Sequence, residues 1–402
     1  MFDLRNYITV TISYWAFTLT DGALRMLVLL YFHTLGYSPI ELAFLFLLYE
    51  FMGVITNLLG GWLGSLLGLK VTLYLGLFLQ VFALWFLSML NPSWSQIFSV
   101  IFVMVAQGLS GIAKDLTKMS SKSAIKFIVP EGEHSVLFKW VAILTGSKNA
   151  LKGMGFFLGG FFLSQVGFIG TLWGMASALL LVLFAVSYFL SGEIGKAKSK
   201  VKFTSIFSKS REINMLSGAR FFLFGARDVW FVVGVPIFLY DVLDWSFTWV
   251  GGFLAVWVIV YGFIQAWAPK VLKLSKDGFS KETLTSQWLS YLLAFVPLSI
   301  AFFIGYGFDP AVIIIGGLTI FGFLFALNSS VHSYLILAFT ESDKVALNVG
   351  FYYMANAGGR LLGSLLSGIS YQIYGLTGCL LTASLMVFIA GLLTIPLSRM
   401  KK

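Results

Sequence analysis

Long apolar stretches alternate along the chain with short polar segments. A transmembrane helix needs about 20 mostly apolar residues, because the hydrocarbon core of a bilayer is about 30 Å thick. Turn-forming sequences such as Asn91-Pro92-Ser93 and Asp309-Pro310 separate neighbouring stretches. The pattern predicts twelve membrane-spanning helices, at roughly residues 8–34, 39–64, 70–90, 95–118, 138–164, 168–191, 214–239, 247–269, 283–305, 311–337, 345–372 and 376–397.

The basic residues outside these spans indicate an orientation. With the N-terminus placed in the cytoplasm, 19 of the 27 Lys and Arg residues fall in inner segments and none falls in an outer loop. Because Lys and Arg accumulate in cytoplasmic loops, we expect a multi-pass protein of the plasma (inner) membrane with both termini in the cytoplasm. The net charge of +10 largely reflects this bias, and it does not indicate binding to nucleic acid.

A polar, Lys-rich segment divides the predicted spans into two sets of six. We therefore expect an N-terminal six-helix bundle at 1–191, a cytoplasmic linker at 192–213 and a C-terminal six-helix bundle at 214–402. A shift of 208 residues places Lys152, Gly155, Gly160 and Gly167 on Arg360, Gly363, Gly368 and Gly375, and Ser38 on Ser246. The pattern predicts an all-α membrane protein of the major facilitator superfamily fold, in which two pseudo-symmetric bundles rock about a site at the midplane.

Twelve ionisable residues are predicted to lie inside the membrane. A charge at the centre of a membrane helix costs at least about 2.5–3.5 kcal/mol, so such residues normally face a water-filled cavity and mark function. They lie on spans 1, 2, 4, 5, 7 and 11, which line or flank the pathway in this fold, and spans 3, 6, 9 and 12 carry none of them. The basic residues are Arg25, Lys114, Lys139, Lys148, Lys152, Arg220, Arg227 and Arg360, and the acidic ones are Asp21, Glu50, Asp115 and Asp228.

The excess of positive charge predicts an anionic substrate, because unpaired cations at low dielectric need a counter-ion. The five basic residues near the middle of their spans are the predicted substrate-binding residues: Arg25, Lys148, Lys152, Arg227 and Arg360. Three further residues are secondary cavity candidates: Lys114, Arg220 and Asn356. The four acids Asp21, Glu50, Asp115 and Asp228 are candidates for ion coupling or for charge pairing.

Some pairings follow from spacing alone. Asp21 and Arg25 are four residues apart and share a helix face. Arg227 and Asp228 are adjacent, so we expect them to point apart and to pair across helices. Asn356 precedes Arg360 by about one turn and is the expected hydrogen-bonding partner of that arginine.

The composition excludes several classes of protein. The chain is 58% hydrophobic and only 11% charged, which is too apolar for an ordinary soluble domain. The single cysteine, Cys379, excludes a disulfide framework. No phosphate-binding loop, metal-ligand spacing or acid–base constellation is present, so we expect neither an enzyme nor a cofactor or metal. A net acidic cavity, as an exporter of hydrophobic cations requires, is also excluded.

Several runs resemble a known family. They are Leu4-Arg5-Asn6-Tyr7, the stretch from Tyr14 to Leu30, Leu35-Gly36-Tyr37-Ser38-Pro39, the stretch from Gly225 to Phe231, and Gly262-Phe263-Ile264-Gln265-Ala266. Together they resemble the organoarsenical efflux permease family ArsJ of the major facilitator superfamily.

The resemblance implies export of 1-arseno-3-phosphoglycerate, a compound that a glyceraldehyde-3-phosphate dehydrogenase makes when arsenate replaces phosphate. It therefore implies a functional link to that enzyme and resistance to arsenate, and we expect a monomer surrounded by membrane lipid. An exchanger of organophosphate and phosphate, or of sugar acids, with the same fold stays open as an alternative. A transport-like sensor that binds without net flux, and the source of energy, also stay open.

Overall fold

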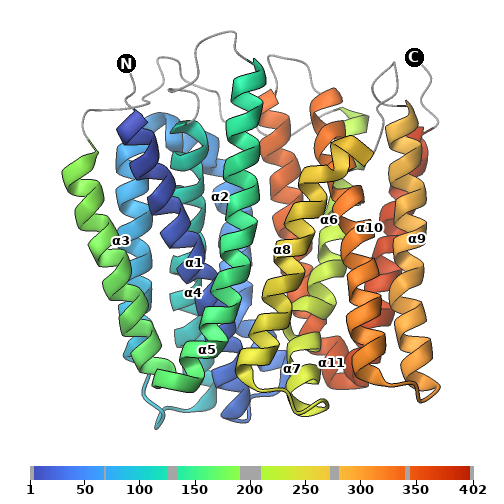
Figure 1. Cartoon of the computed structure of the whole chain (residues 1–402), viewed down its shortest axis with the longest axis horizontal. Helices are drawn as coiled ribbons and strands as arrows, with labels where there is room; N and C mark the ends of the chain where they lie inside the picture. The colour runs from blue at the N-terminus through green and yellow to red at the C-terminus, as the bar shows by residue number, and fades with distance from the viewer. Residues whose placement is uncertain are drawn as a thin grey trace. The chain divides into compact units, whose positions relative to one another are not determined.

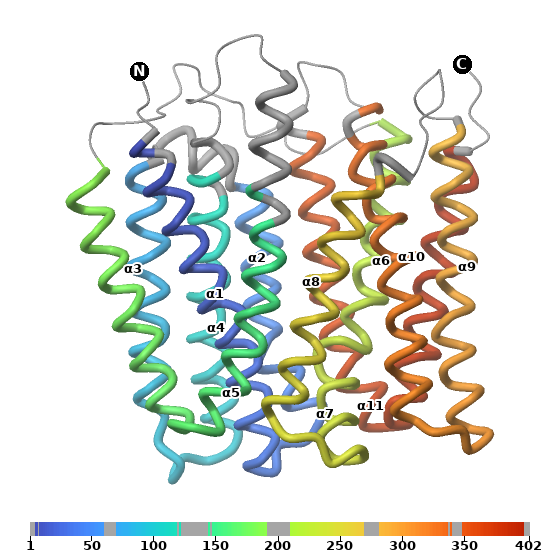
Figure 2. Tube along the Cα trace, in the orientation of Figure 1, coloured from blue at the N-terminus to red at the C-terminus, as the bar shows by residue number. Residues whose placement is uncertain are grey.

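The computed structural model describes residues 4–67, 69–124, 134–190, 210–271, 280–339 and 345–398, and the statements below concern these residues. Every regular element among them is helical (Figures 1 and 2). The elements are α1 (Leu4–Thr34), α2 (Pro39–Leu67), α3 (Leu69–Ser88), α4 (Gln96–Ala124), α5 (His134–Phe189), α6 (Arg211–Val229), η3 (Trp230–Gly234), α7 (Val235–Asp241), α8 (Phe247–Val271), α9 (Ser280–Gly305), α10 (Pro310–Ala338) and α11 (Val345–Ser398).

Ten of these helical stretches are long and apolar enough to cross a membrane, and two of them are twice the necessary length. The apolar parts of α5 and α11 contain 43 and 50 residues, or about 65 and 75 Å at 1.5 Å per residue. Each is broken in the middle, at Gly167 (φ 74°, ψ −177°) and at Gly375 (φ 58°, ψ −151°). That backbone region is open almost only to glycine. Each helix therefore forms two spans, which confirms the twelve predicted crossings of a multi-pass membrane protein.

The span from Arg211 to Asp241 contains a π-helical turn, η3, between α6 and α7. Pro236 lies in the first turn of α7. A proline has no N–H and its ring clashes with the carbonyl one turn earlier, so the helix must widen there. The Oγ atom of Ser367 on α11 accepts hydrogen bonds from the N–H groups of Val233 (3.1 Å) and Gly234 (3.3 Å), which stabilises the widened turn.

The chain divides into two compact units. Unit 1 comprises Met1–Tyr31, Ile55–Phe203 and Phe247–Ile259, and unit 2 comprises Phe32–Val54, Thr204–Ser246 and Val260–Lys402. In unit 1, α3 packs against α4 and α5, and in unit 2, α11 packs against α6 and α9 (Figure 1). The predicted linker 192–213 lies outside the described residues up to Lys209, and the division at that segment stays a prediction.

Glycines bring one pair of helices into close contact in each unit. In unit 1, a Cβ atom on Gly155 of α5 would collide with the carbonyl oxygen of Leu19 on α1. In unit 2, a Cβ atom on Gly363 of α11 would collide with the carbonyl oxygen of Gly225 on α6. Gly155 and Gly363 correspond under the 208-residue shift, so the two units repeat the same small-residue crossing.

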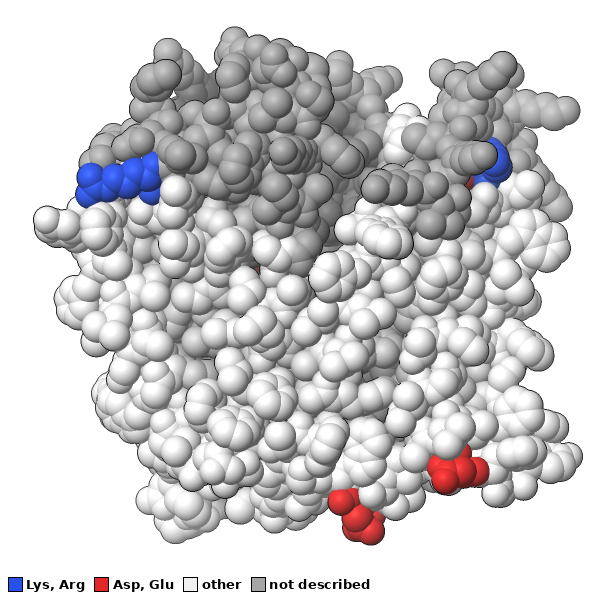
Figure 3. Space-filling model, in the orientation of Figure 1, with Lys and Arg blue, Asp and Glu red and all other residues white. Residues whose placement is uncertain are grey.

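Large apolar side chains are exposed along the helices. Leu181, Phe184 and Phe295 are 71%, 64% and 69% exposed. Burial of such side chains normally contributes about 1.5–3 kcal/mol each, so lipid must cover them. On the face seen in Figure 3 the middle is almost free of visible charged side chains, and the Lys, Arg, Asp and Glu residues that can be seen there lie towards its edges.

Candidate functional site

In unit 1, a carboxylate on α1 faces a cation on α5. The Oδ2 atom of Asp21 lies 3.7 Å from Nζ of Lys152, and the two side chains are 6% and 20% exposed. The Lys152 ammonium also lies 5.9 Å from the ring centroid of Phe156, within cation–π range. The crossing at Gly155 is what allows the backbones of α1 and α5 to approach and these side chains to meet.

Two more of the predicted cations lie one turn away from this pair. Arg25 follows Asp21 by four residues on α1 and is 8% exposed, and Lys148 precedes Lys152 by four residues on α5 and is half-buried. Residues four apart share a helix face. The helix faces that meet where α1 crosses α5 therefore carry three cations, Arg25, Lys148 and Lys152, and one aspartate, Asp21.

Asp115 on α4 belongs to a separate polar cluster of unit 1. Its Oδ2 atom accepts a hydrogen bond of 2.5 Å from Oγ1 of Thr56, and its Oδ1 atom lies 3.3 Å from Nζ of Lys118. That lysine also donates to Oδ1 of Asn57 (2.9 Å). The Asp115 carboxylate is 2% exposed, and both of its oxygens have partners on Thr56 and Lys118. These contacts favour charge pairing over ion coupling as its role. Lys114 precedes it on α4 and is half-buried.

Unit 2 contains a chain of four alternating charges. Nη2 of Arg360 on α11 lies 2.5 Å from Oε1 of Glu50 on the first half of α2, and its Nε lies 3.1 Å from Oδ2 of Asp228 on α6. Asp228 in turn accepts through Oδ1 from Nε (2.7 Å) and Nη2 of Arg227. Both carboxylates are 1% exposed and both arginines 17%. Two of the predicted substrate cations are thus neutralised largely by carboxylates of their own unit.

The adjacent pair Arg227–Asp228 contradicts the expectation that these two side chains point apart. Their Cβ atoms do leave the helix in different directions, about 100° apart, as successive residues of a helix must. The arginine side chain is long enough to bend back along the helix surface and reach its neighbour. Asp228 consequently bridges two arginines, one from its own helix and one from α11.

Arg220 differs from these arginines, because all its partners in the described part of the chain are neutral. Its Nε donates to Oδ1 of Asn356 (3.2 Å), and its Nη1 donates to the carbonyl oxygen (3.1 Å) and to Oγ (3.0 Å) of Ser329. Its Cζ lies 3.8 Å from the ring centroid of Phe224 and 5.1 Å from that of Tyr352. The residue is 5% exposed. A full positive charge is therefore held here by dipoles and aromatic faces.

The environment of Arg220 corrects one prediction and adds residues that sequence reasoning missed. Asn356 is the partner of Arg220, whereas it was expected to bind Arg360. The Ser329 hydroxyl also accepts from Nε2 of Gln265 (3.1 Å) and lies 3.4 Å from the hydroxyl of Tyr261. A signal was present, since polar residues are rare in spans of this kind, but spacing alone could not join residues so far apart in the sequence.

Repeat symmetry extends to the charged residues. Lys152 and Arg360 correspond under the 208-residue shift, and Asp21 falls within one residue of Asp228. Each unit therefore pairs a cation on its glycine-rich crossing helix with an aspartate on the helix that it crosses. Lys139 is the one predicted intramembrane cation whose side chain lies outside the described part. The described residues contain no group of three His, Cys, Asp or Glu side chains that could hold a metal ion.

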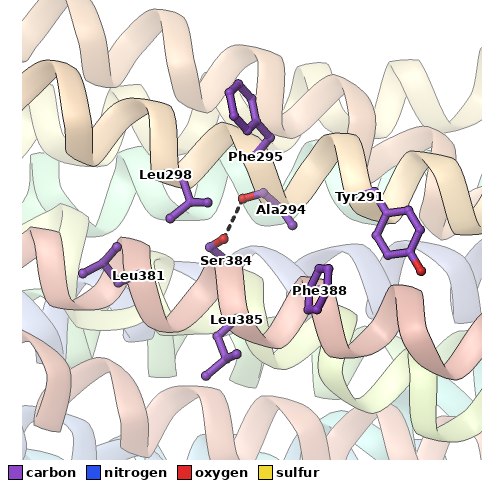
Figure 4. A pocket seen from close by; sticks show the side chains of 8 residues that line it. All are labelled: Tyr291, Ala294, Phe295, Leu298, Leu381, Ser384, Leu385 and Phe388. Atoms are coloured by element: carbon purple, nitrogen blue, oxygen red, sulfur yellow. Dashed lines mark hydrogen bonds between the residues drawn. The ribbon is translucent and has the colours of Figure 1, made fainter.

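A groove between α9 and α11 in unit 2 is lined mainly by apolar side chains, unlike the charged clusters described above (Figure 4). Its polar side chains are those of Tyr291 and Ser384, and the serine hydroxyl is occupied by a 2.7 Å hydrogen bond to the carbonyl oxygen of Ala294. Phe295 and Leu385 on its rim are 69% and 60% exposed. The lining is Tyr291, Ala294, Phe295, Leu298, Leu381, Ser384, Leu385 and Phe388. It suits an apolar chain such as that of a lipid, and it offers nothing to an anion.

Solved structures of membrane transporters are similar to this fold. A bacterial homologue of the iron transporter ferroportin in an inward-facing state matches with a TM-score of 0.71 and 14% identity over 99% of both chains. The outward-facing state of such a homologue gives 0.68 and 13% over 99% of this chain and 100% of that chain. A structure that concerns substrate recognition in proton-dependent oligopeptide transporters gives 0.71 and 14% over 98% of both chains.

No protein-family model matches the sequence, and no curated protein matches it. At such low identity the solved structures show the fold alone. They confirm the major facilitator fold that the sequence predicts. The inward-facing and outward-facing structures match almost equally well, so the comparison identifies an architecture and not a conformation.

Proposed function

We propose that this chain is a secondary transporter for a small organic anion. One observation carries the proposal: Arg220 is a buried cation whose partners in the described residues are all neutral. A buried charge without an opposite charge is costly, so an incoming anion would be its natural counter-ion. Arg25, Lys148, Lys152, Arg227 and Arg360 stay proposed substrate contacts, with Glu50, Asp21 and Asp228 as proposed partners in the coupling of transport to an ion.

For the substrate we propose 1-arseno-3-phosphoglycerate, exported across the plasma membrane by a protein with both termini in the cytoplasm. The resemblance to the ArsJ permeases supports this choice, and it links the transporter to a glyceraldehyde-3-phosphate dehydrogenase that forms the compound. The compound carries a tetrahedral oxyanion at each end, and the planar fork of an arginine binds such groups through two hydrogen bonds. Transport would then confer resistance to arsenate.

Two measurements test the proposal. Arsenate-sensitive cells that express the chain together with the dehydrogenase should tolerate more arsenate than cells that express either protein alone. Everted membrane vesicles that contain the chain should take up labelled 3-phosphoglycerate as an analogue of the substrate. They should accumulate arsenic only when arsenate, glyceraldehyde 3-phosphate, NAD and the dehydrogenase are all supplied. Equal killing in all cells would remove the arsenic assignment. Vesicles that take up labelled 3-phosphoglycerate but gain no arsenic in the complete mixture would favour the organophosphate exchanger.

Arg220→Gln is the sharpest substitution for the same assay. The amide can keep the hydrogen bond to Asn356 but removes the charge, so we expect uptake to fall by at least ten-fold. Arg211→Gln, at the exposed first residue of α6, is the matched control and should leave uptake unchanged. Unchanged uptake in Arg220→Gln would show that the anion does not use this cation.

A further inference from the structure

Three side chains of α6 lie on one face of the helix in unit 2. Arg220, Phe224 and Arg227 follow one another at intervals of four and three residues, the spacing that keeps residues on the same side of an α-helix. The Phe224 ring contacts both cations: Cζ of Arg220 is 3.8 Å and Cζ of Arg227 is 5.1 Å from its centroid. Both distances are measured to one point, so the two guanidinium carbons lie at most about 9 Å apart, the sum of the two.

Each of these arginines keeps a terminal nitrogen available. Arg220 uses Nε and Nη1 in its hydrogen bonds, and Arg227 uses Nε and Nη2. Within the described part of the chain, Nη2 of Arg220 and Nη1 of Arg227 make no hydrogen bond. A buried nitrogen without a hydrogen bond would be an unsatisfied donor, and neither of these two atoms is one. Both therefore reach solvent-accessible space. A guanidinium presents five N–H donors in a fixed fork, and here part of each fork is presented to a ligand.

The charge balance favours an anion at this face. Away from their first and last turns, the described spans of unit 2 carry three cations, Arg220, Arg227 and Arg360, and two carboxylates, Glu50 and Asp228. A third buried carboxylate, Glu282, lies in the first turn of α9. The first two carboxylates bind Arg227 and Arg360, whereas Arg220 is held by Asn356 and Ser329. The net positive charge is therefore concentrated at the Arg220 end of the face.

We propose that Arg220 and Arg227 bind the two ends of one substrate that carries an oxyanion at each end of a short chain, and that Phe224 fixes the spacing between them. The inference rests on the proposed anion transport and specifies the class of anion. Two oxyanions on the ends of a three-carbon chain lie roughly 7 Å apart, at about 1.2 Å of advance per bond. That length lies within the upper limit of about 9 Å on the separation of the two guanidinium carbons. The aromatic ring that both cations contact offers the middle of the substrate an apolar surface.

Competition for uptake into everted vesicles tests this site. Labelled 3-phosphoglycerate, with a phosphate and a carboxylate at opposite ends, is the probe, and unlabelled 3-phosphoglycerate and glycerol 3-phosphate are the competitors. In the wild type we expect 3-phosphoglycerate to compete at a concentration at least about ten-fold lower than glycerol 3-phosphate, since the second oxyanion gains a charge-assisted contact of about 1.5 kcal/mol. In Arg220→Gln the ratio should fall to about two-fold or less, and Arg220→Lys should give an intermediate ratio.

The spacing role of Phe224 needs its own variant. Phe224→Leu removes the ring that both cations contact, and we expect it to lower the ratio at least three-fold while weak uptake remains. Phe222→Leu on the same helix is the matched control, because the Phe222 ring contacts Phe221 and neither arginine. The fold of each variant is checked by its elution as a single species in detergent.

The outcomes separate this inference from the proposed function. A wild type that takes up both anions with equal preference, or an Arg220→Gln protein that folds and keeps the wild-type ratio, overturns the two-cation site and leaves anion transport standing. A wild type that takes up neither anion overturns anion transport itself, and the site with it. A ratio that collapses in Arg220→Gln and in Phe224→Leu but not in Phe222→Leu is the result that supports the site.

Discussion

The ion pair between Glu50 and Arg360 makes the most direct quantitative prediction. Both side chains are nearly buried, at 1% and 17% exposed, and their charged atoms lie 2.5 Å apart. Arg360 also binds Asp228, so Arg360→Gln leaves two buried carboxylates short of a partner. Removal of one member of a buried pair typically costs about 3–5 kcal/mol, and we expect a loss of that size.

Glu50→Gln should cost less. The amide oxygen can still accept a hydrogen bond from Arg360, and Arg360 keeps its contact with Asp228, so we expect a loss of about 1–3 kcal/mol. The double variant should lose less free energy of unfolding than the two single variants do in sum. Once one member of the ion pair has been replaced, replacing the other no longer breaks that contact. The difference, a coupling free energy of about 1–3 kcal/mol, is the contribution of the contact itself.

The assay is reversible unfolding in a titration of mixed micelles with a denaturing detergent, followed by the fluorescence of the 12 tryptophans. Asp244→Asn is the control for exchange of an acid for an amide, since Asp244 is exposed and makes no ion pair with described residues; its free energy of unfolding should change by less than about 0.5 kcal/mol. A coupling free energy below about 0.5 kcal/mol between Glu50 and Arg360 would refute the reasoning, because residues in a genuine buried contact do not add independently.

Three further substitutions test the packing and the breaks of the helices. Gly155→Ala and Gly363→Ala place a Cβ atom against a carbonyl oxygen and should each lower the free energy of unfolding by about 1–3 kcal/mol, whereas Gly174→Ala, with open space around it, should not. Gly375→Ala forces an alanine into a conformation suited to glycine and should cost about 1–3 kcal/mol, which the same detergent titration measures. Asp115→Asn weakens the bonds from Thr56 and Lys118, and we expect a lower midpoint of thermal unfolding while labelled phosphoglycerate still enters vesicles.

The sequence predicts the helices and their breaks because the bilayer imposes simple limits on length. An apolar stretch such as that of α11 is too long for one crossing, so a break near its middle is expected, and the structure has it at Gly375. The contacts of the charged residues are harder to predict from the sequence. Their spans follow from the sequence, but their partners depend on how helices cross. Arg220 and Ser329 are 109 positions apart, and their contact cannot be seen from the sequence.

Pairing also changes which cations are available. Depth in the span favours Arg360 over Arg220 as a substrate-binding residue, since Arg360 lies near the middle of its span. In the structure Arg360 is bound to two carboxylates and Arg220 to none among the described residues. A mid-span position therefore identifies residues that must be neutralised, and only the folded arrangement distinguishes a partner inside the protein from a partner that is transported.

The proposed anion transport requires release of the substrate as well as binding, and Asp228 lies where it would compete with a bound anion. It shares Oδ1 with Arg227, so a substrate oxyanion at that arginine competes with a carboxylate of the protein. Binding that is strong enough to load but weak enough to unload is a general requirement of transport. Asp228→Asn should therefore lower the KM for phosphoglycerate and also lower kcat, because the unpaired Arg227 holds the anion longer. A higher KM with unchanged kcat would contradict this reasoning and would assign Asp228 the role of positioning the two arginines that it bridges.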